Sequence, residues 1–285
     1  MSRFLHGDQT ATSWGRGDYG QMAARLAPVA ERAVARVAVG ARDRVLDLAC
    51  GDGNASLAAA RRGASRVVGI DFEPALLDRA RQRDTGRQVQ WHLGDIQTLE
   101  LRGEAYDVIL SIFGVMYAPD QDRVAEQIAR ACAPGARVAL SAWTPGSFMP
   151  EMGRVLAPYL PSPPANGAPP SRWGDASAVE ALLRPHGLSI TDATQDLVEL
   201  VFDDRDDAVE FLIQTAGHVV QERARLVREV RWEALRRDLR ELVAERDQPG
   251  DGEVRLPLEY LLAIGERLPD TRHPLADIAP DESST

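Results

Sequence analysis

Between about residues 42 and 143, short apolar segments typical of β-strands alternate with segments of helical periodicity. This alternation constrains the fold more than any other feature, since five strand–helix alternations with short connections predict a parallel sheet covered by helices on both faces. The expected strands are 44–50, 66–71, 89–95, 106–113 and 137–143. The first expected helix follows the first strand and ends at residue 60, and two more span 73–83 and 121–132. A turn is expected at Pro134 and Gly135.

The flanking segments have other patterns. Apolar residues at helical spacing between Met22 and Val37 predict an N-terminal helix, and the proline-rich stretch within 144–174 is typical of a lid or pocket wall. A helix, a strand, a long helical stretch and a final strand are then expected at 175–187, 188–202, 203–247 and 254–266. The predicted organisation is an N-terminal helical lid (1–40), a ligand-binding core (41–143), a cap with further elements (144–253), the final strand (254–266) and a flexible tail (267–285).

Composition excludes several classes of protein. The 33 basic and 43 acidic residues give a net charge of −10, which argues against binding to nucleic-acid backbones. No apolar run is long enough for a membrane span, and the first residues lack the apolar region of a signal peptide. The two cysteines provide neither a disulfide framework nor a cysteine-rich zinc site. We therefore expect a cytoplasmic protein without a membrane, nucleic-acid or metal partner.

The segment VLDLACGDGN (45–54) carries the clearest ligand-binding pattern. Gly51 and Gly53 lie at the predicted turn from the first strand into its helix, where a Cβ would block close approach of a ligand to the backbone. A dinucleotide-binding fingerprint would place a third glycine where this chain has Ser56. Instead, Asp47 on the strand is followed by Ala49, Gly51 and Gly53 at alternate positions.

Acidic residues mark the ends of three predicted strands. Asp71 ends the second strand, where a carboxylate can accept hydrogen bonds from both hydroxyls of a ribose. Asp95 ends the third strand, where a carboxylate can accept a hydrogen bond from an amine such as adenine N6. Together with Asp47 they are expected along the carboxyl edge of the sheet, which is where open α/β sheets bind ligands.

These segments resemble the class I S-adenosylmethionine (SAM)-dependent methyltransferases over residues 41–143. The segment at Trp14–Tyr19 and the segment SIFGVMYAP (111–119) are also similar to those of a bacterial subgroup of that family. The resemblance implies an α/β, Rossmann-like sheet of seven strands in the order 3-2-1-4-5-7-6, with a helical cap. The last strand would be antiparallel, and residues 254–266 are its candidate. The matching segments are VLDLACGDGN, VVGIDFEPALLDRARQR, HLGDIQTL, YDVILSIFGVMYAPD and ACAPGARVALSAW.

The resemblance implies SAM as cofactor, S-adenosylhomocysteine as product, and a role for each matching residue. On the adenosyl side, Asp71 would hold the ribose, Phe72 would flank the adenine, and the Gly94–Asp95–Ile96 segment would read the adenine edge. On the methionyl side the Gly51/Gly53 turn would lie against the amino acid, with Ala49 in place of the first glycine of the motif. The remaining implied contacts are Ser111 near the sulfonium, Tyr19 as a closing residue, and Asp47, which would either order the glycine turn or meet the amine of the ligand.

The expected reaction is methyl transfer to O, N or C of a small organic molecule, in specialised metabolism, by a monomer or homodimer. Alignment and exclusion of water supply much of the rate, and a general base is needed only if the acceptor loses a proton. His218, expected at the start of a cap helix, is the candidate base or substrate contact. The alternatives are a SAM-binding protein or cyclase of the same fold that transfers no methyl, a peptide or RNA methyltransferase, and a dehydrogenase.

Overall fold

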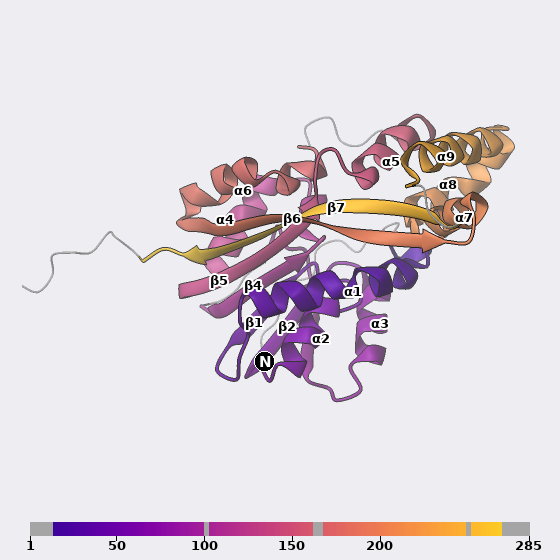
Figure 1. Cartoon of the computed structure of the whole chain (residues 1–285). Helices are drawn as coiled ribbons and strands as arrows, with labels where there is room; N and C mark the ends of the chain where they lie inside the picture. The colour runs from indigo at the N-terminus through magenta and orange to yellow at the C-terminus, as the bar shows by residue number, and fades with distance from the viewer. Residues whose placement is uncertain (1–13, 100–102, 162–167, 249–251, 270–285) are drawn as a thin grey trace, which may run out of the picture.

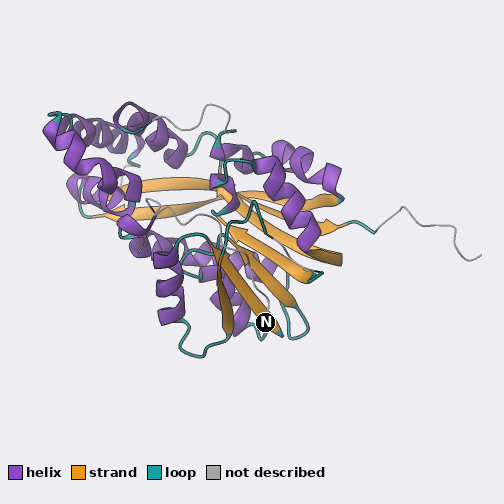
Figure 2. Ribbon diagram, turned by 180° about the vertical axis from the view of Figure 1, so that it is seen from behind, coloured by secondary structure: helices purple, strands orange, loops and turns teal. Residues whose placement is uncertain are grey.

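The computed structural model describes residues 14–99, 103–161, 168–248 and 252–269. These residues form a seven-stranded sheet in the order β3-β2-β1-β4-β5-β7-β6 (Figures 1 and 2). Strands β1 to β5 pair in parallel, and β7 is antiparallel to both of its neighbours, so the predicted fold is confirmed. The strands are β1 (Arg44–Leu48), β2 (Arg66–Asp71), β3 (Val89–Leu93), β4 (Tyr106–Ile112), β5 (Cys132–Trp143), β6 (Leu188–Phe202) and β7 (Val254–Arg267).

Helices cover both faces of the sheet, and a further group lies beyond one end (Figure 1). One face carries α1 (Tyr19–Arg36), α2 (Asn54–Arg61) and α3 (Pro74–Arg83), and the other carries α4 (Gln121–Ala131) and α6 (Ala176–Leu183). The group beyond the sheet, here called the cap, consists of α5 (Phe148–Leu156), α7 (Arg205–Thr215), α8 (Gly217–Arg228) and α9 (Trp232–Arg246). No helix in the described ranges has the length and apolar character needed to cross a bilayer.

The burial of each strand follows from its place in the sheet. Strands β1 and β2 are buried at nearly every position, as expected for parallel strands inside such a sheet. The edge strand β6 alternates between more and less exposed residues, as expected for a strand with one face towards solvent. Strands β6 and β7 pair along their whole length and extend beyond the others, and α7, α8 and α9 of the cap connect them (Figure 1).

Several predicted boundaries differ from the structure; the first strand, for example, ends at Leu48 and not at residue 50. The helical stretch 203–247 is three helices, with corners at Ala216 and at Val230, whose φ of +57° no α-helix accommodates. The third strand ends at Leu93, because the Asp95 carboxylate accepts the Gln97 N–H in a local turn (2.8 Å).

The predicted turn at Pro134 and Gly135 lies inside β5, where the pairing with β4 shifts register between Tyr106 and Val108. Gly135 has a φ of +72°, which permits this bulge. The predicted flexible tail begins too early, because Arg267 belongs to β7 and its guanidinium donates to the carbonyls of His186 (2.8 Å) and Ala129 (3.1 Å). Residues 270–285 lie outside the described residues, as do residues 1–13 of the predicted lid.

Candidate functional site

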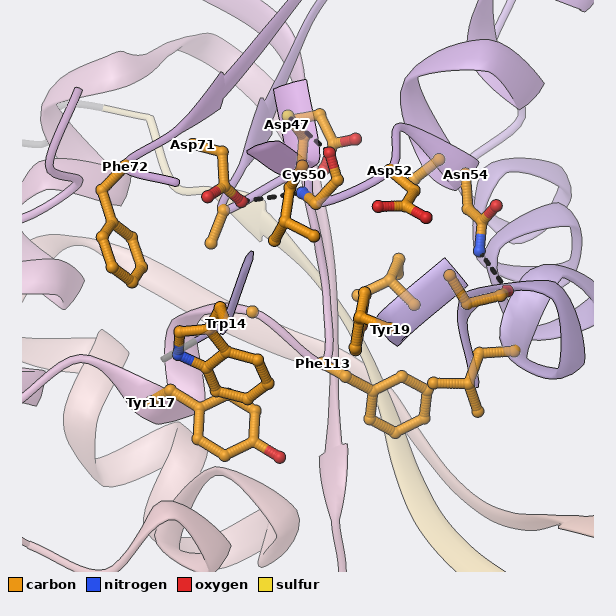
Figure 3. A pocket seen from close by; sticks show the side chains of 18 residues that line it. Trp14, Tyr19, Asp47, Cys50, Asp52, Asn54, Asp71, Phe72, Phe113 and Tyr117 are labelled. Carbon is orange, nitrogen blue, oxygen red and sulfur yellow. Dashed lines mark hydrogen bonds between the residues drawn. The ribbon is translucent and has the colours of Figure 1, made fainter. Parts of the chain in front are cut away.

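A pocket lies at the carboxyl ends of β1, β2 and β4, where the first turn of α1 approaches the sheet (Figure 3). It encloses about 690 Å³ of empty space, including the part open to solvent. The polar side chains in its lining come mainly from the turn after β1 and from the end of β2, and aromatic rings come from the N-terminal segment and from the loop after β4. Six of the predicted cofactor residues line it: Tyr19, Asp47, Ala49, Gly51, Asp71 and Phe72.

The turn after β1 presents its backbone to the pocket. Gly51 has a φ of +55°, and the nearest atom that a Cβ there would meet is Cε1 of Tyr19 at 3.6 Å. Ala49 also lies in the left-handed region, with a φ of +52°. This conformation is costly for a residue other than glycine, and such strained positions gather at functional sites. The Gly51 N–H donates to Oδ2 of Asp71 (2.8 Å), so the turn and the end of β2 are held together.

Asp71 is a buried carboxylate in the pocket lining, with only 3% of its surface exposed. Its two oxygens accept the backbone N–H groups of Gly51 (2.8 Å) and Glu73 (2.9 Å). Burial raises the pKa of Asp71 to about 6, although both hydrogen bonds act to lower it. Each carboxylate oxygen can accept more than one hydrogen bond, so Asp71 keeps acceptor capacity for hydroxyl groups of a ligand.

Asp47 serves the start of α2 and also faces the pocket. Its Oδ2 accepts both the backbone N–H (2.9 Å) and the hydroxyl (2.7 Å) of Ser56. Burial raises the pKa of Asp47 to about 7, against the lowering effect of Ser56. The two roles that the sequence left open for Asp47 are therefore compatible, because one oxygen orders the glycine turn and its helix while the residue still lines the pocket.

Asp52 and Asn54 also line the pocket, and sequence reasoning missed both. Asp52 is buried, and its Oδ1 accepts a hydrogen bond from Nε of Arg79 on α3 (3.2 Å). Burial raises the pKa of Asp52, whereas Arg79 lowers it. The amide of Asn54 donates to the carbonyl of Ala23 (2.7 Å) and so ties α1 to α2. The position of Asp52 between Gly51 and Gly53 could have indicated from the sequence that its side chain lies at the pocket.

Aromatic side chains form the side of the pocket opposite the carboxylates (Figure 3). Trp14, in the 3-10 helix η1 (Trp14–Arg16), packs edge-on against Tyr117 with ring centroids 4.7 Å apart. Phe113 has a φ of +56°, and its ring also faces the pocket. We call Trp14, Phe113 and Tyr117 the aromatic wall. Phe113 and Tyr117 were not predicted as pocket residues, although they belong to the segment SIFGVMYAP (111–119) that carries part of the family resemblance.

Two predicted cofactor residues serve the fold and lie outside the pocket lining. A Cβ on Gly53, which has a φ of +82°, would lie 2.4 Å from the ring of Trp91, so the side chain of Trp91 accounts for the glycine. The Ser111 hydroxyl donates to the carbonyl of Leu48 (2.7 Å) and accepts the N–H of Val115 (3.0 Å). It therefore joins the ends of β1 and β4.

The segment after β3 also lies outside this lining. Both oxygens of Asp95 accept hydrogen bonds from Gln97, whose backbone N–H and side-chain amide contribute 2.8 Å, 3.2 Å and 3.1 Å contacts. The Gly94 N–H donates to the carbonyl of Asp71 (2.9 Å), and Ile96 is buried. Recognition of the adenine edge by Gly94, Asp95 and Ile96 stays a prediction.

His218 starts α8 but does not line the pocket. Burial lowers its pKa, and none of the described residues forms a hydrogen bond with its side chain. Its predicted catalytic role stays a prediction. Among the described residues, no cluster of histidine, cysteine or acidic side chains is arranged to hold a metal ion.

The N-terminal segment contacts the pocket through Trp14 and Tyr19 and, further along α1, through Ala23 and Leu26. The body of α1 packs into the core through buried residues from Met22 to Val34. Residues 14–19, here called the strap, instead run between α3 and the corner of α7 and α8. A Cβ on Gly17 would lie 2.8 Å from the carbonyl oxygen of Gln214, and the Asp18 N–H donates to that same oxygen (2.8 Å).

The charged side chains in the described lining of the pocket are all acidic. Asp47, Asp52 and Asp71 line it, and no arginine or histidine stands among the described lining residues. Arg79 pairs with Asp52 from outside this lining, but a ligand that brings positive charge would still stabilise the ionised forms of Asp47 and Asp71.

Three comparisons place this chain among known proteins. A family profile described as "Methyltransferase domain" matches residues 45–135. Uncharacterised proteins of Mycobacterium tuberculosis and Mycobacterium bovis are 34% identical over 259 residues, which is 89% of this chain and 92% of theirs. A 2-phytyl-1,4-naphtoquinone methyltransferase of Synechococcus elongatus is 36% identical over 104 residues, or 34% of this chain and 45% of that protein. The structure of a putative methyltransferase of Bacillus halodurans matches with a TM-score of 0.59 at 15% identity, covering 84% of this chain and 98% of that one.

Proposed function

Since this chain belongs to the class I SAM-dependent methyltransferases, we propose that it methylates a small organic molecule that binds against the aromatic wall. The observation that carries the proposal is the composition of the pocket. Three buried carboxyl groups line it around a backbone turn that a ligand can approach closely, and Arg79 pairs with Asp52 from outside the lining. SAM carries its positive charge at the sulfonium and the amine, so its charge complements this lining.

The residues of the pocket fit the cofactor. The open face of Gly51 would accommodate the methionyl part, which the ring of Tyr19 would cover. The remaining lone pairs of Asp71 would accept the ribose hydroxyls. Phe72, which is partly exposed at the pocket edge, would lie beside the adenine. Asp47 and Asp52 would balance the positive charge of the ligand.

When bound, SAM supplies a methyl group that its sulfonium already activates for transfer. The chain itself holds the reactants in place and excludes water, which accounts for much of the rate in such a reaction. The strap and Tyr117 are positioned for this, because Trp14 packs against both Tyr19 (5.9 Å between ring centroids) and Tyr117. The acceptor atom would lie on the side of the pocket formed by the aromatic wall.

A flat, weakly charged acceptor suits this wall better than an anion. The carboxylates of the pocket repel negative charge, and planar rings pack well against aromatic side chains. The Synechococcus relative is named for a naphthoquinone, a flat ring system with oxygen substituents, which supports an acceptor of this kind.

Binding of the cofactor tests the proposal. Calorimetry with SAM and S-adenosylhomocysteine should give saturable binding, and Asp71→Asn should weaken it about 10- to 100-fold, as expected for lost hydrogen bonds to a charged group. Asp78→Asn is the matched control, because Asp78 lies on the exposed side of α3. Asp95→Asn tests the predicted contact with adenine separately.

Turnover distinguishes the alternatives. Incubation with SAM and candidate ring acceptors should release S-adenosylhomocysteine together with a methylated product. Tight SAM binding without release of S-adenosylhomocysteine, with any of these acceptors, would favour a SAM-binding protein or a cyclase of the same fold. Absence of SAM binding, or full affinity in Asp71→Asn, would contradict the assignment of the pocket.

A further inference from the structure

A second hollow lies at the end of the sheet away from the cap, where β6 begins and β7 ends (Figure 1). Its walls come from the C-terminal half of α4, the 3-10 helix η5 (Arg184–His186) and the end of β7. Since Cys132 begins β5 directly after α4, the hollow lies at the amino ends of the parallel strands, whereas the cofactor pocket lies at their carboxyl ends. The described residues that line this hollow, here called the basic hollow, are Glu126, Ala129, Arg130, Arg184, Pro185, His186, Gly187, Arg267, Leu268 and Pro269.

The basic hollow has an excess of positive charge, although the net charge of the chain is −10. Arg130, Arg184 and Arg267 line it, and Glu126 is the only acidic residue among its described lining residues. Nη1 of Arg123, which lies outside the lining, donates to Oε2 of Glu126 (2.5 Å), whereas Arg130 is 4.0 Å from Oε1. Within the described ranges, the side chain of Arg184 has no hydrogen bond and no ion pair. A bound anion would therefore reduce the repulsion between these cations.

One guanidinium group of the basic hollow is held in a fixed position. Nη1 of Arg267 donates to the carbonyl oxygens of His186 (2.8 Å) and Ala129 (3.1 Å). A Cβ on Gly187 would lie 3.7 Å from Cζ of Arg267, so the side chain rests against this glycine. Among the described residues, none accepts a hydrogen bond from Nε or Nη2 of Arg267, and neither atom is buried. These N–H groups are therefore available to the oxygens of a ligand.

The chemistry of these side chains favours a phosphate group. Guanidinium groups bind oxyanions through paired N–H donors, and a phosphate monoester offers three oxygens and about two negative charges at neutral pH. The basic hollow encloses about 970 Å³ of empty space, including the part open to solvent, which leaves room for an organic group beside the phosphate.

We propose that the basic hollow binds the phosphate group of a small phosphorylated molecule. Arg267 provides the fixed contact, and Arg130 of α4 and Arg184 of η5 bind the remaining phosphate oxygens. The organic part of the ligand lies against Leu268 and Pro269. This site is separate from the cofactor pocket, and the proposal does not depend on the proposed function.

Calorimetric titration with glycerol 3-phosphate tests the proposal, with glycerol as the control ligand that lacks the phosphate. Sodium chloride keeps the ionic strength constant, so that screening of charge is the same in every titration. The wild-type chain should bind glycerol 3-phosphate saturably and should not bind glycerol. Arg130→Gln and Arg184→Gln should each weaken binding about three- to tenfold, and the double variant should weaken it further, as expected for lost charge-assisted hydrogen bonds. Both side chains are exposed, so the fold should be retained.

Arg62→Gln is the matched control, because it removes the same charge from an exposed position at the end of α2, on the other face of the sheet. It should keep the affinity of the wild-type chain, and a thermal melt of each variant reports whether it is folded. Equal affinities in Arg62→Gln and the double variant would overturn the proposal, as would absence of saturable binding to the wild-type chain. Competition by S-adenosylhomocysteine would also overturn it, because the phosphate would then occupy the cofactor pocket.

Discussion

At the scale of single residues, the pocket contains several buried acidic side chains, and burial raises their pKa values. Asp47 and Asp71 each lie almost completely out of solvent, and desolvation of the charged form raises both pKa values. Such shifts occur typically where a ligand completes the electrostatics of a site. A cationic ligand would stabilise the ionised carboxylates and so compete with protons for them.

The affinity for SAM should therefore increase with pH between about 5 and 8. Below the pKa of Asp71, about 6, the free protein holds a proton that the cation must displace, and the same applies to Asp47 below about 7. Binding then releases protons, and the affinity should rise by up to about tenfold per pH unit for each proton released. Calorimetry at several pH values, in two buffers of different ionisation enthalpy, measures both the affinity and the proton release.

Asp47→Asn provides the control, because its amide oxygen can still accept from Ser56. This variant should lose the pH dependence near 7 and keep that near 6. An affinity that is flat or falls as the pH rises would contradict the linkage and would indicate that both carboxylates bind the cofactor in their protonated form.

At the scale of elements, the strap connects the cap to the cofactor pocket. Its position depends on close backbone contacts, because Gly15 packs against Glu73 and Ala75 while Gly17 packs against Gln214 and Gly217. The hydrogen bond from Asp18 to Gln214 fixes this arrangement just before Tyr19 reaches the pocket. The cap therefore contacts the segment that carries Trp14 and Tyr19 without lining the pocket itself.

Gly17→Ala should weaken SAM binding about five- to tenfold while leaving the core folded. The added Cβ would lie 2.8 Å from the Gln214 carbonyl oxygen and 2.9 Å from the Gly217 nitrogen, so the strap must move and lose part of its contact with α8. Calorimetry of SAM and a thermal melt distinguish these effects. Gly153→Ala on α5, where a Cβ meets nothing within 4 Å, is the control and should retain full affinity. Equal affinities in both variants would show that the strap does not close the pocket.

At the scale of the whole molecule, one sheet joins the ligand-binding core to the cap. Strand β7 pairs with β5 of the core on one side and with β6 on the other, and three of the four cap helices, α7 to α9, connect β6 to β7. The buried residues of both parts belong to one continuous hydrophobic cluster. The cap is therefore an extension of the core.

Unfolding should accordingly occur in one transition. Loss of the cap would expose β6 and β7, and loss of β7 would expose the edge of β5, so neither part is stable without the other. Scanning calorimetry should give a calorimetric enthalpy close to the van't Hoff value, and helical and tryptophan signals should change together. An early transition with loss of helix signal alone would show that the cap unfolds independently.

The sequence patterns predicted the strands of the parallel sheet and the turn at its carboxyl edge, whereas the full sheet order came from the resemblance to a known family. Periodicity identifies strands and helices because apolar residues must face the core, and the parallel order brings Asp47 and Asp71 to the same edge. Boundaries were less predictable where a local contact competes with the regular structure. The Asp95 turn that ends β3 is one such case, and the positive φ at Val230 that ends α8 is another.

The sequence by itself thus determined which segments form the sheet and where a ligand would approach it, since both follow from local periodicity and from glycine. Only the tertiary structure decided which of the predicted residues line the pocket and which others join them, because those contacts connect residues far apart in the chain. Gly53 is required by the ring of Trp91, Asp52 is paired with Arg79, and Trp143 of β5 stacks on Phe113 of the aromatic wall. No pattern along the sequence records such contacts, since packing selects them after the elements have formed.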